Sequence, residues 1–433
     1  MPDEPNLLGE IDTLMTSLKT ASGKEKALLY EKMGDVYAKA EKFRKAEILY
    51  KQALDGGGEG LPLMRKYIDT LVKTGQTAKS IQFIEGALQG VTDMVQRALL
   101  IVRKAHLKWH TGEFDDGRRC AELALEILEK ERLKDPALME PYADANNILG
   151  LCLWELARYD RALEKFDISA KTYDSLKDFK GLAKVKNNTG LVLWQWGHYD
   201  DALNAYAEAI NADEKDGGWS MFGHAQNNIA IILMERGDLD GAESCIQIAN
   251  KTFAAQGFER GIHMVELNFM DLNLERGDIT KATFWAERGL KGFTNMKDES
   301  RVAYAKCGFA RIYCAKGDLK TAEKYAMEAV KAAGRAKARE TEGLALRALS
   351  EIEVKKGDLA YAETLLRRSL DIFRSVNFVY ELGRALKELA LFLNTKGEKE
   401  ESQKAATEAR TVLSKIGAKL ELERLEKGLS GKA

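Results

Sequence analysis

Apolar residues recur along this chain in a pattern that repeats every forty residues. Within each segment they fall three and four positions apart, the spacing of amphipathic helices, and a short polar phrase separates one helix from the next. A typical phrase is GDLDGA at 237–242, with a turn residue first, an apolar residue two positions later and alanine five positions later. The turn residues of the series are Ala157, Gly197, Gly237, Gly277, Gly317, Gly357 and Gly397. A fixed period of this length predicts a solenoid of helical hairpins.

Before residue 157 the same phrases occur at less regular spacing, near Glu41, Gly75 and Gly112. Together with the later series they give an all-α solenoid of about ten helical hairpins. We expect three parts along the chain: an N-terminal capping helix in residues 1–26, a repeat array in 27–402, and a final helix with a C-terminal cap in 403–433. A last helix is expected at about 418–427, and the sequence leaves open whether it occupies the groove of the array.

Two positions in each repeat hold small residues, which allow paired helices to approach closely. The eighth position has Gly150, Gly190 and Ala230, and the twentieth has Ala162, Ala202, Ala242, Ala282, Ala322 and Ala362. This arrangement resembles the tetratricopeptide repeat, and the 40-residue period resembles the arrays of Pins-type spindle-orientation scaffolds and kinesin light chains. The resemblance implies a right-handed α-α superhelix that binds peptides or adaptor proteins in its concave groove.

In that family the first helix of each hairpin lines the groove through its second, fifth, ninth, twelfth and thirteenth positions. The fifth position holds Asn147, Asn187 and Asn227 in three successive repeats. A primary amide both donates and accepts hydrogen bonds, so a ladder of asparagines would suit an extended peptide backbone. The alternative is that each amide bonds to a neighbouring helix of the array.

The twelfth position holds Trp109, Trp154 and Trp194. On the inner face these would form an apolar stripe of the kind that anchors a partner. The alternative is that the stripe forms the core between adjacent hairpins, which is the more usual place for tryptophan at helical spacing.

Toward the C-terminus the inner positions become basic, with Arg311, Arg347, Arg384 and Lys387. Such a pocket would accept a carboxylate or acidic side chains of a partner. The alternative is that these charges form an ordinary solvated face, paired with acidic neighbours such as Glu388.

Other candidate chemistry is weak, and the sequence indicates neither an enzyme nor a cofactor or metal protein. His106 and His110 share a helix face, but no carboxylate completes a zinc-protease motif between them. The glycine-rich segment 56–60 lacks the lysine and hydroxyl of a phosphate-binding loop. Cys307 and Cys314 are expected to be small apolar residues of the inner face.

Charge and composition limit the partners. The formal net charge is -1, so no overall field favours nucleic acid. No run of apolar residues is long enough for direct membrane insertion, and the N-terminus shows no secretory signal, so a cytoplasmic location is expected. The sequence therefore predicts a scaffold or adaptor for another protein or peptide segment, with homo-oligomerisation left open. The alternative is a ligand-sensing regulator whose superhelical pitch changes when it binds a small peptide.

Overall fold

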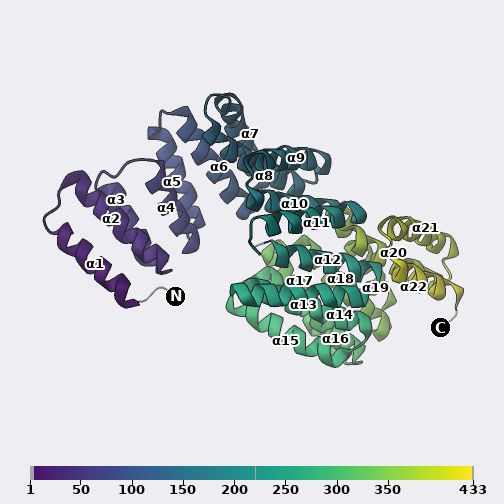
Figure 1. Ribbon diagram of the computed structural model, residues 1–433. Helices are drawn as coiled ribbons and strands as arrows, with labels where there is room; N and C mark the ends of the chain where they lie inside the picture. Colours follow the sequence, from purple (N-terminus) through teal and green to yellow (C-terminus); the bar gives the residue numbers. More distant parts are fainter. Residues whose placement is uncertain (1–3, 220, 432–433) are drawn as a thin grey trace. The chain divides into compact units, whose positions relative to one another are not determined.

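The computed structural model describes residues 4–219 and 221–431, and this part of the chain contains helices and no β-strands (Figure 1). It divides into two compact units, Met1–Leu156 (unit 1) and Ala157–Ala433 (unit 2). Within the described residues, none of the helices is both long enough and apolar enough to cross a bilayer. The all-α solenoid predicted from the sequence is confirmed.

Unit 1 consists of eight α-helices and one short 3-10 helix. Consecutive helices pack in pairs, α2 with α3, α4 with α5 and α6 with α7. The helices are α1 (Glu4–Leu18), α2 (Gly23–Lys39), α3 (Phe43–Asp55), α4 (Leu61–Lys73), α5 (Thr77–Gly90), α6 (Met94–His110), α7 (Phe114–Glu131), η1 (Pro136–Leu138) and α8 (Met139–Glu155).

Unit 2 begins with α9 and contains six hairpins, from α10/α11 to α20/α21, followed by the single helix α22. In the described residues, twenty α-helices follow α1 and precede α22 along the chain, the number expected for ten hairpins. The helices are α9 (Tyr159–Leu176), α10 (Phe179–Gln195), α11 (Tyr199–Lys215), α12 (Phe222–Arg236), α13 (Leu239–Gln256), α14 (Glu259–Arg276), α15 (Ile279–Asn295), α16 (Glu299–Ala315), α17 (Leu319–Ala336), α18 (Arg339–Lys356), α19 (Leu359–Ser375), α20 (Val379–Lys396), α21 (Lys399–Ile416) and α22 (Lys419–Ser430).

The repeated phrase forms the turn inside each hairpin. Gly237 has φ +90°, a left-handed conformation that glycine adopts without steric cost. The next residue, Asp238, begins the second helix by accepting a hydrogen bond from the backbone N–H of Gly241 at 3.0 Å. The same aspartate cap recurs at Asp278, Asp318 and Asp358. The predicted turn positions are therefore confirmed, with a cap that stops one helix and starts the next.

Small residues hold the paired helices close together. The alanines at the twentieth position, such as Ala202 and Ala242, are completely buried. At the eighth position, a Cβ added to Gly190 would lie 2.4 Å from the ring of Tyr206 on the paired helix. Any larger residue at position 190 would push α10 and α11 apart, which explains the pattern seen in the sequence.

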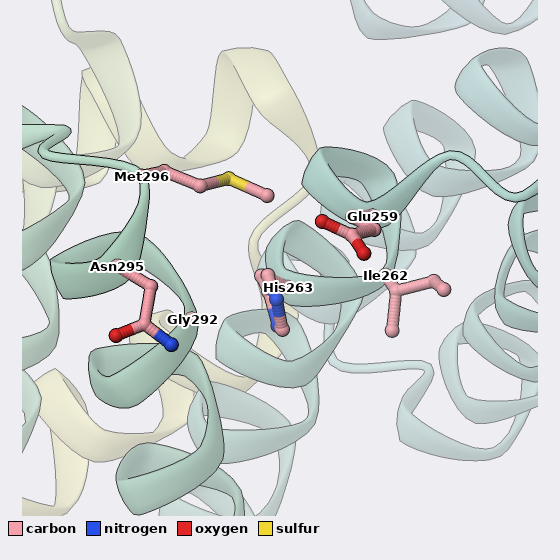
Figure 2. A pocket seen from close by; sticks show the side chains of 6 residues that line it. All are labelled: Glu259, Ile262, His263, Gly292, Asn295 and Met296. Atoms are coloured by element: carbon pink, nitrogen blue, oxygen red, sulfur yellow. The ribbon is translucent and has the colours of Figure 1, made fainter.

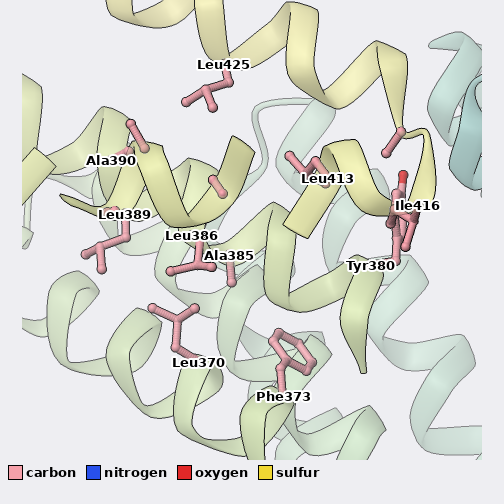
Figure 3. Packing of buried hydrophobic residues seen from close by; sticks show 14 of the residues in the cluster. Leu370, Phe373, Tyr380, Ala385, Leu386, Leu389, Ala390, Leu413, Ile416 and Leu425 are labelled. Atoms are coloured by element: carbon pink, nitrogen blue, oxygen red, sulfur yellow. The ribbon is translucent and has the colours of Figure 1, made fainter. Parts of the chain in front are cut away.

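Helices α10 to α12 and α19 to α22 of unit 2 meet in one apolar cluster. Figure 3 shows side chains of α19 to α22 directed toward one another, including Phe373, Leu386, Leu413 and Leu425. The same cluster contains Tyr199, Ala202 and Tyr206 of α11 and Ala225 and Ile232 of α12. The helix series of unit 2 is therefore closed on itself by a shared core.

Polar contacts reinforce this closure. The side chain of Gln195 donates to the carbonyl oxygen of Val376 at 2.9 Å. Arg236 Nε donates to the carbonyl of Ile416 at 3.2 Å, and Lys415 Nζ donates to the carbonyl of Trp196 at 3.1 Å. Each of these bonds joins α10 or α12, or the turn that follows α10, to the C-terminal hairpins. The boundary expected at residue 402 falls inside α21, one of the helices that make the closure.

Candidate functional site

Three arginines from three helices converge on one carboxylate inside unit 2. Glu275, near the end of α14, lies 3.1 Å from Arg311 Nη2 of α16 and 3.4 Å from Arg384 Nη2 of α20. It also lies 3.0 Å from Arg424 Nη1 of α22. The α14 helix is thereby tied to α20 and α22 across the inner face of the unit.

Further ion pairs extend from this point into a connected group. Arg311 Nη1 also bonds to Asp271 at 2.9 Å, and Asp271 accepts a hydrogen bond from the hydroxyl of Tyr304 at 2.6 Å. Arg347 lies 3.0 Å from Glu381 and 2.5 Å from Glu388. We call the group the Glu275 cluster; its members are Asp271, Glu275, Arg311, Arg347, Glu381, Arg384, Lys387, Glu388, Glu421 and Arg424.

Helix α22 contributes one acid and one base to the Glu275 cluster. Glu421 is 1% exposed and lies 2.5 Å from Lys387 Nζ of α20. Arg424, one turn later on the same helix face, bonds to Glu421 at 2.6 Å as well as to Glu275. Together with the completely buried Leu425, these contacts seat α22 against α20 and the end of α14.

The basic side chains of the Glu275 cluster keep its buried glutamates ionised. Burial would raise the pKa of Glu275, but the guanidinium groups of Arg384, Arg311 and Arg424 hold it well below its usual range. Burial likewise opposes ionisation of Glu421, yet Arg384 and Lys387 lower its pKa to about 2. Both side chains are therefore carboxylates at neutral pH.

The four basic residues predicted from the sequence to form a pocket lie together, and acidic neighbours neutralise their charges. Arg311, Arg347, Arg384 and Lys387 all belong to the Glu275 cluster, and each is ion-paired. The cluster holds five basic and five acidic side chains. Arg347 and Lys387 are buried, so these two residues are not part of a solvated face.

A second buried carboxyl group lies where the ends of unit 2 meet. Glu235 of α12 accepts hydrogen bonds from Trp194 Nε1 at 2.9 Å and from the hydroxyl of Tyr199. Burial raises the pKa of Glu235 to about 8, against these two donors. Trp194 also packs edge-on against Phe378, with 5.9 Å between ring centroids. Trp194 is thus part of the closure as well as of the predicted aromatic stripe.

The three asparagines predicted to form a ladder are buried. Asn187 accepts a hydrogen bond from Asn228 Nδ2 at 3.1 Å, and Asn227 accepts one from Asn268 Nδ2 at 2.6 Å. Each of these two amides is therefore bonded to an asparagine of the following repeat, the arrangement that the alternative interpretation describes. Asn147 lies on α8 in unit 1.

The other two tryptophans of the stripe are half-buried in unit 1. Trp109 lies beside His106 and His110, at centroid distances of 6.2 Å and 4.7 Å, and the two imidazole rings are themselves 4.4 Å apart. The Nε1 of Trp109 is buried without a hydrogen-bond partner among the described residues. Trp154 lies near the end of α8. Residues 4–219 and 221–431 contain no group of three or more histidine, cysteine, aspartate or glutamate side chains that could hold a metal ion.

Sequence reasoning named Glu388 as an acidic partner but missed the other four acids of the Glu275 cluster, Asp271, Glu275, Glu381 and Glu421. Glu275 and Glu235 stand at the thirteenth position of their repeats, where Glu155 and Gln195 stand in the two repeats before them. This column of acidic and amide residues on an expected inner position is the signal that could have revealed them. Their pairing with α20 and α22 depends on closure of unit 2, which the repeat pattern does not show.

The family models that match this chain agree with the helical hairpins of the structure. Two tetratricopeptide repeat models match residues 141–215 and 187–249. The chain carries tetratricopeptide repeats. A search of the curated proteins returned no significant match.

Solved tetratricopeptide-like structures share the fold at low sequence identity. A Rap protein complexed with Competence and Sporulation Factor has a TM-score of 0.59 at 14% identity, covering 82% of this chain and 99% of that one. The apo form of the quorum sensor NprR from B. thuringiensis has a TM-score of 0.56 at 12% identity, covering 86% and 99%. NprR in complex with its cognate peptide NprX has a TM-score of 0.51 at 16% identity, covering 71% and 88%. At these identities the likeness concerns the fold alone.

Proposed function

We propose that this protein is a non-enzymatic, cytoplasmic scaffold or adaptor, and that unit 2 binds an acidic peptide or helix of a partner protein on its inner face. The observation that carries the proposal is the convergence of Arg311, Arg384 and Arg424 on the single carboxylate of Glu275. Planar guanidinium groups suit carboxylates, and three of them supply more donors than one carboxylate can use.

In this proposal Glu275 stands where a partner's carboxylate would bind. The Glu275 cluster is neutral, so an acidic segment gains little unless it replaces an internal acid. The bonds of Glu275 to Arg384 and Arg424 also tie α14 to α20 and α22. A partner that takes over the arginines would release Glu275 and loosen this tie, and the inner face would then open to a longer segment.

The same proposal also assigns roles to the tryptophans, asparagines and other basic residues predicted from the sequence. Once α22 and α20 move away from α12, the indole of Trp194 and the amides of Asn187 and Asn227 would become available to a partner backbone and its apolar side chains. Arg347 and Lys387 would accept further acidic groups. In unit 1, the corresponding contacts would come from Trp109, Trp154 and Asn147.

The test is a random-peptide display selection on the full chain. We expect the recovered peptides to be enriched in aspartate and glutamate, and to bind Arg384→Gln at least about tenfold more weakly, a loss of roughly 1.4 kcal/mol. The matched control is Arg335→Gln, which removes an exposed arginine of α17. Recovered peptides without acidic residues, or equal binding to Arg384→Gln, would contradict the proposal.

A second candidate function is a peptide sensor that changes its superhelical pitch. It is favoured by the closure of unit 2, because contacts such as that between Gln195 and Val376 must separate if the pitch increases. Two of the structures with the same fold hold a peptide or signalling factor according to their descriptions. A change in radius of gyration by solution X-ray scattering on adding a selected peptide would favour the sensor, and an unchanged radius would favour the scaffold.

A further inference from the structure

A cavity of about 420 Å³ lies in the hairpin of α14 and α15, apart from the Glu275 cluster. Figure 2 shows His263 between Gly292 and Asn295 of α15 on one side and Ile262 and Glu259 of α14 on the other. Met296 completes the lining. The volume is within the range of small-ligand sites.

The position of His263 is exceptional among the repeats of this chain. Positions forty residues apart from it hold only alanine or glycine, as in Ala183, Gly223, Ala303, Gly343 and Gly383. The residue facing it has changed in the opposite direction, because Gly292 replaces the larger residues Thr172, Ala212, Thr252, Ala332 and Ile372. A Cβ at position 292 would lie 2.3 Å from the imidazole ring, so the glycine makes room for the histidine.

A charge inversion in the same hairpin orients the imidazole. In two other repeats of unit 2, a lysine on the first helix pairs with a glutamate on the second, Lys186 with Glu208 at 2.6 Å and Lys306 with Glu328 at 2.8 Å. Here the pair is reversed, and Glu266 of α14 accepts from Arg288 Nε of α15 at 2.8 Å.

The reversal places a buried carboxylate where it can hold His263. The second oxygen of Glu266 lies 2.8 Å from His263 Nδ1. A lysine in place of Glu266 could not accept that hydrogen bond. Because Glu266 is the acceptor, Nδ1 carries the proton, and in the neutral ring Nε2 is the nitrogen left for a ligand.

We propose that this cavity binds a guanidinium or ammonium group on an aliphatic chain, as in an arginine or lysine side chain of a basic peptide segment. The Glu259 carboxylate, His263 Nε2 and the Asn295 carbonyl oxygen are hydrogen-bond acceptors, and Ile262 and Met296 offer apolar contact for the aliphatic stem. Two arginines near the cavity are already ion-paired: Arg288 with Glu266 at 2.8 Å, and Arg260 with Asp298 at 2.7 Å. Arg260 also packs over the ring of Phe293.

The site is tested by NMR of the full chain with ¹⁵N-labelled histidine. The chain has only 5 histidines, and His263→Gln identifies the signals of this ring. The probe is N-acetyl-arginine methylamide, and the control probe is the neutral citrulline analogue. We expect a saturable shift of the His263 Nε2 signal with the arginine probe, at a dissociation constant on the order of 1 mM, and no saturable shift with citrulline.

Two variants separate the site from general charge effects. Glu259→Gln should weaken binding by up to about fivefold, whereas Glu299→Gln, the same exposed position one repeat later, should leave it unchanged. Gly292→Ala should displace the imidazole and abolish the shift, because a Cβ at position 292 would lie 2.3 Å from the ring. No saturable shift, an equal shift with citrulline, binding that Glu259→Gln leaves unchanged, or a shift with Zn²⁺ and none with arginine would overturn the proposal.

Discussion

Trp194, Tyr199 and Glu235 show how single residues serve the closure of unit 2. The two donors come from α10 and α11 and meet the carboxyl group of α12 beside the C-terminal helices. Because the folded state raises the pKa of Glu235 to about 8, folding retains a proton that the unfolded chain releases near pH 4.5. This side chain therefore makes the protein less stable as pH rises through that interval.

The first prediction concerns Glu235→Gln. Glutamine keeps an acceptor for Trp194 and Tyr199 but does not titrate. The free energy of unfolding of the wild type should fall, relative to that of the variant, by roughly 2 to 4 kcal/mol between pH 5 and pH 8. Urea unfolding at both pH values measures this difference. Glu408→Gln, at an exposed site on α21, is the control, and parallel pH profiles for wild type and Glu235→Gln would refute the expectation.

The second prediction concerns the asparagines. Asn227→Ala removes the acceptor of the Asn268 amide in a buried place, so it should lower the free energy of unfolding by about 1 to 3 kcal/mol. Asn250→Ala, at a half-buried position on α13 with no comparable bond described, is the comparison. If Asn227→Ala unfolds like the wild type, the amide contributes little to the array and its role lies in binding.

The residue pattern predicted which basic residues lie together better than it predicted which side chains they pair with. The sequence grouped Arg311, Arg384 and Lys387 as one basic region, and all three belong to the Glu275 cluster. It could not show that Glu275 neutralises two of them, because Glu275 is 109 residues from Arg384 along the chain. For the asparagines, the rotation of each helix about its axis decides which neighbour is reached, and composition carries no information about that angle.

At the scale of elements, α22 has two functions in unit 2. It covers the apolar cluster through Leu425, and it supplies Glu421 and Arg424 to the Glu275 cluster. Its existence was predicted from three leucines, at 418–427, and the helix observed is Lys419–Ser430. The sequence left open where this helix packs, and the structure shows that it contacts α20 and the end of α14.

The third prediction is made for the removal of residues 417–433. The truncated chain should expose the inner face of α20 and lose part of the closure, so backbone amides of α20 should exchange with deuterium faster than in the full chain. Removal of residues 431–433 alone is the control. Unchanged exchange in α20 after the longer truncation would mean that α22 does not cover this face in solution.

The helices themselves were predictable because each turn carries local signals. The glycine and aspartate of the turn phrase act within a few residues, as the cap of Asp238 shows. The closure was not predictable in this way. It joins α10 and α12 to the C-terminal end of α19 and to α21 through bonds that span 180 or more residues, and the superhelical pitch that brings them together is a sum of small rotations.

At the scale of the whole molecule, we propose that unit 2 contains a binding groove whose arginines are occupied by the protein's own carboxylate, Glu275. The closure contacts and the Glu275 cluster lie entirely within this unit. A peptide that binds the arginines must therefore compete with Glu275, and the affinity observed for the wild type includes the cost of displacing it.

The measurement that tests this claim most directly is the affinity of a selected acidic peptide for the wild type and for Glu275→Gln, by calorimetry after both chains are shown to be folded. Without the internal carboxylate, Arg311, Arg384 and Arg424 keep their charge, and each loses one of its acceptors. The account predicts that the variant binds the peptide at least about tenfold more tightly, a gain of roughly 1.4 kcal/mol. Equal or weaker binding by Glu275→Gln would show that the partner does not take the place of Glu275.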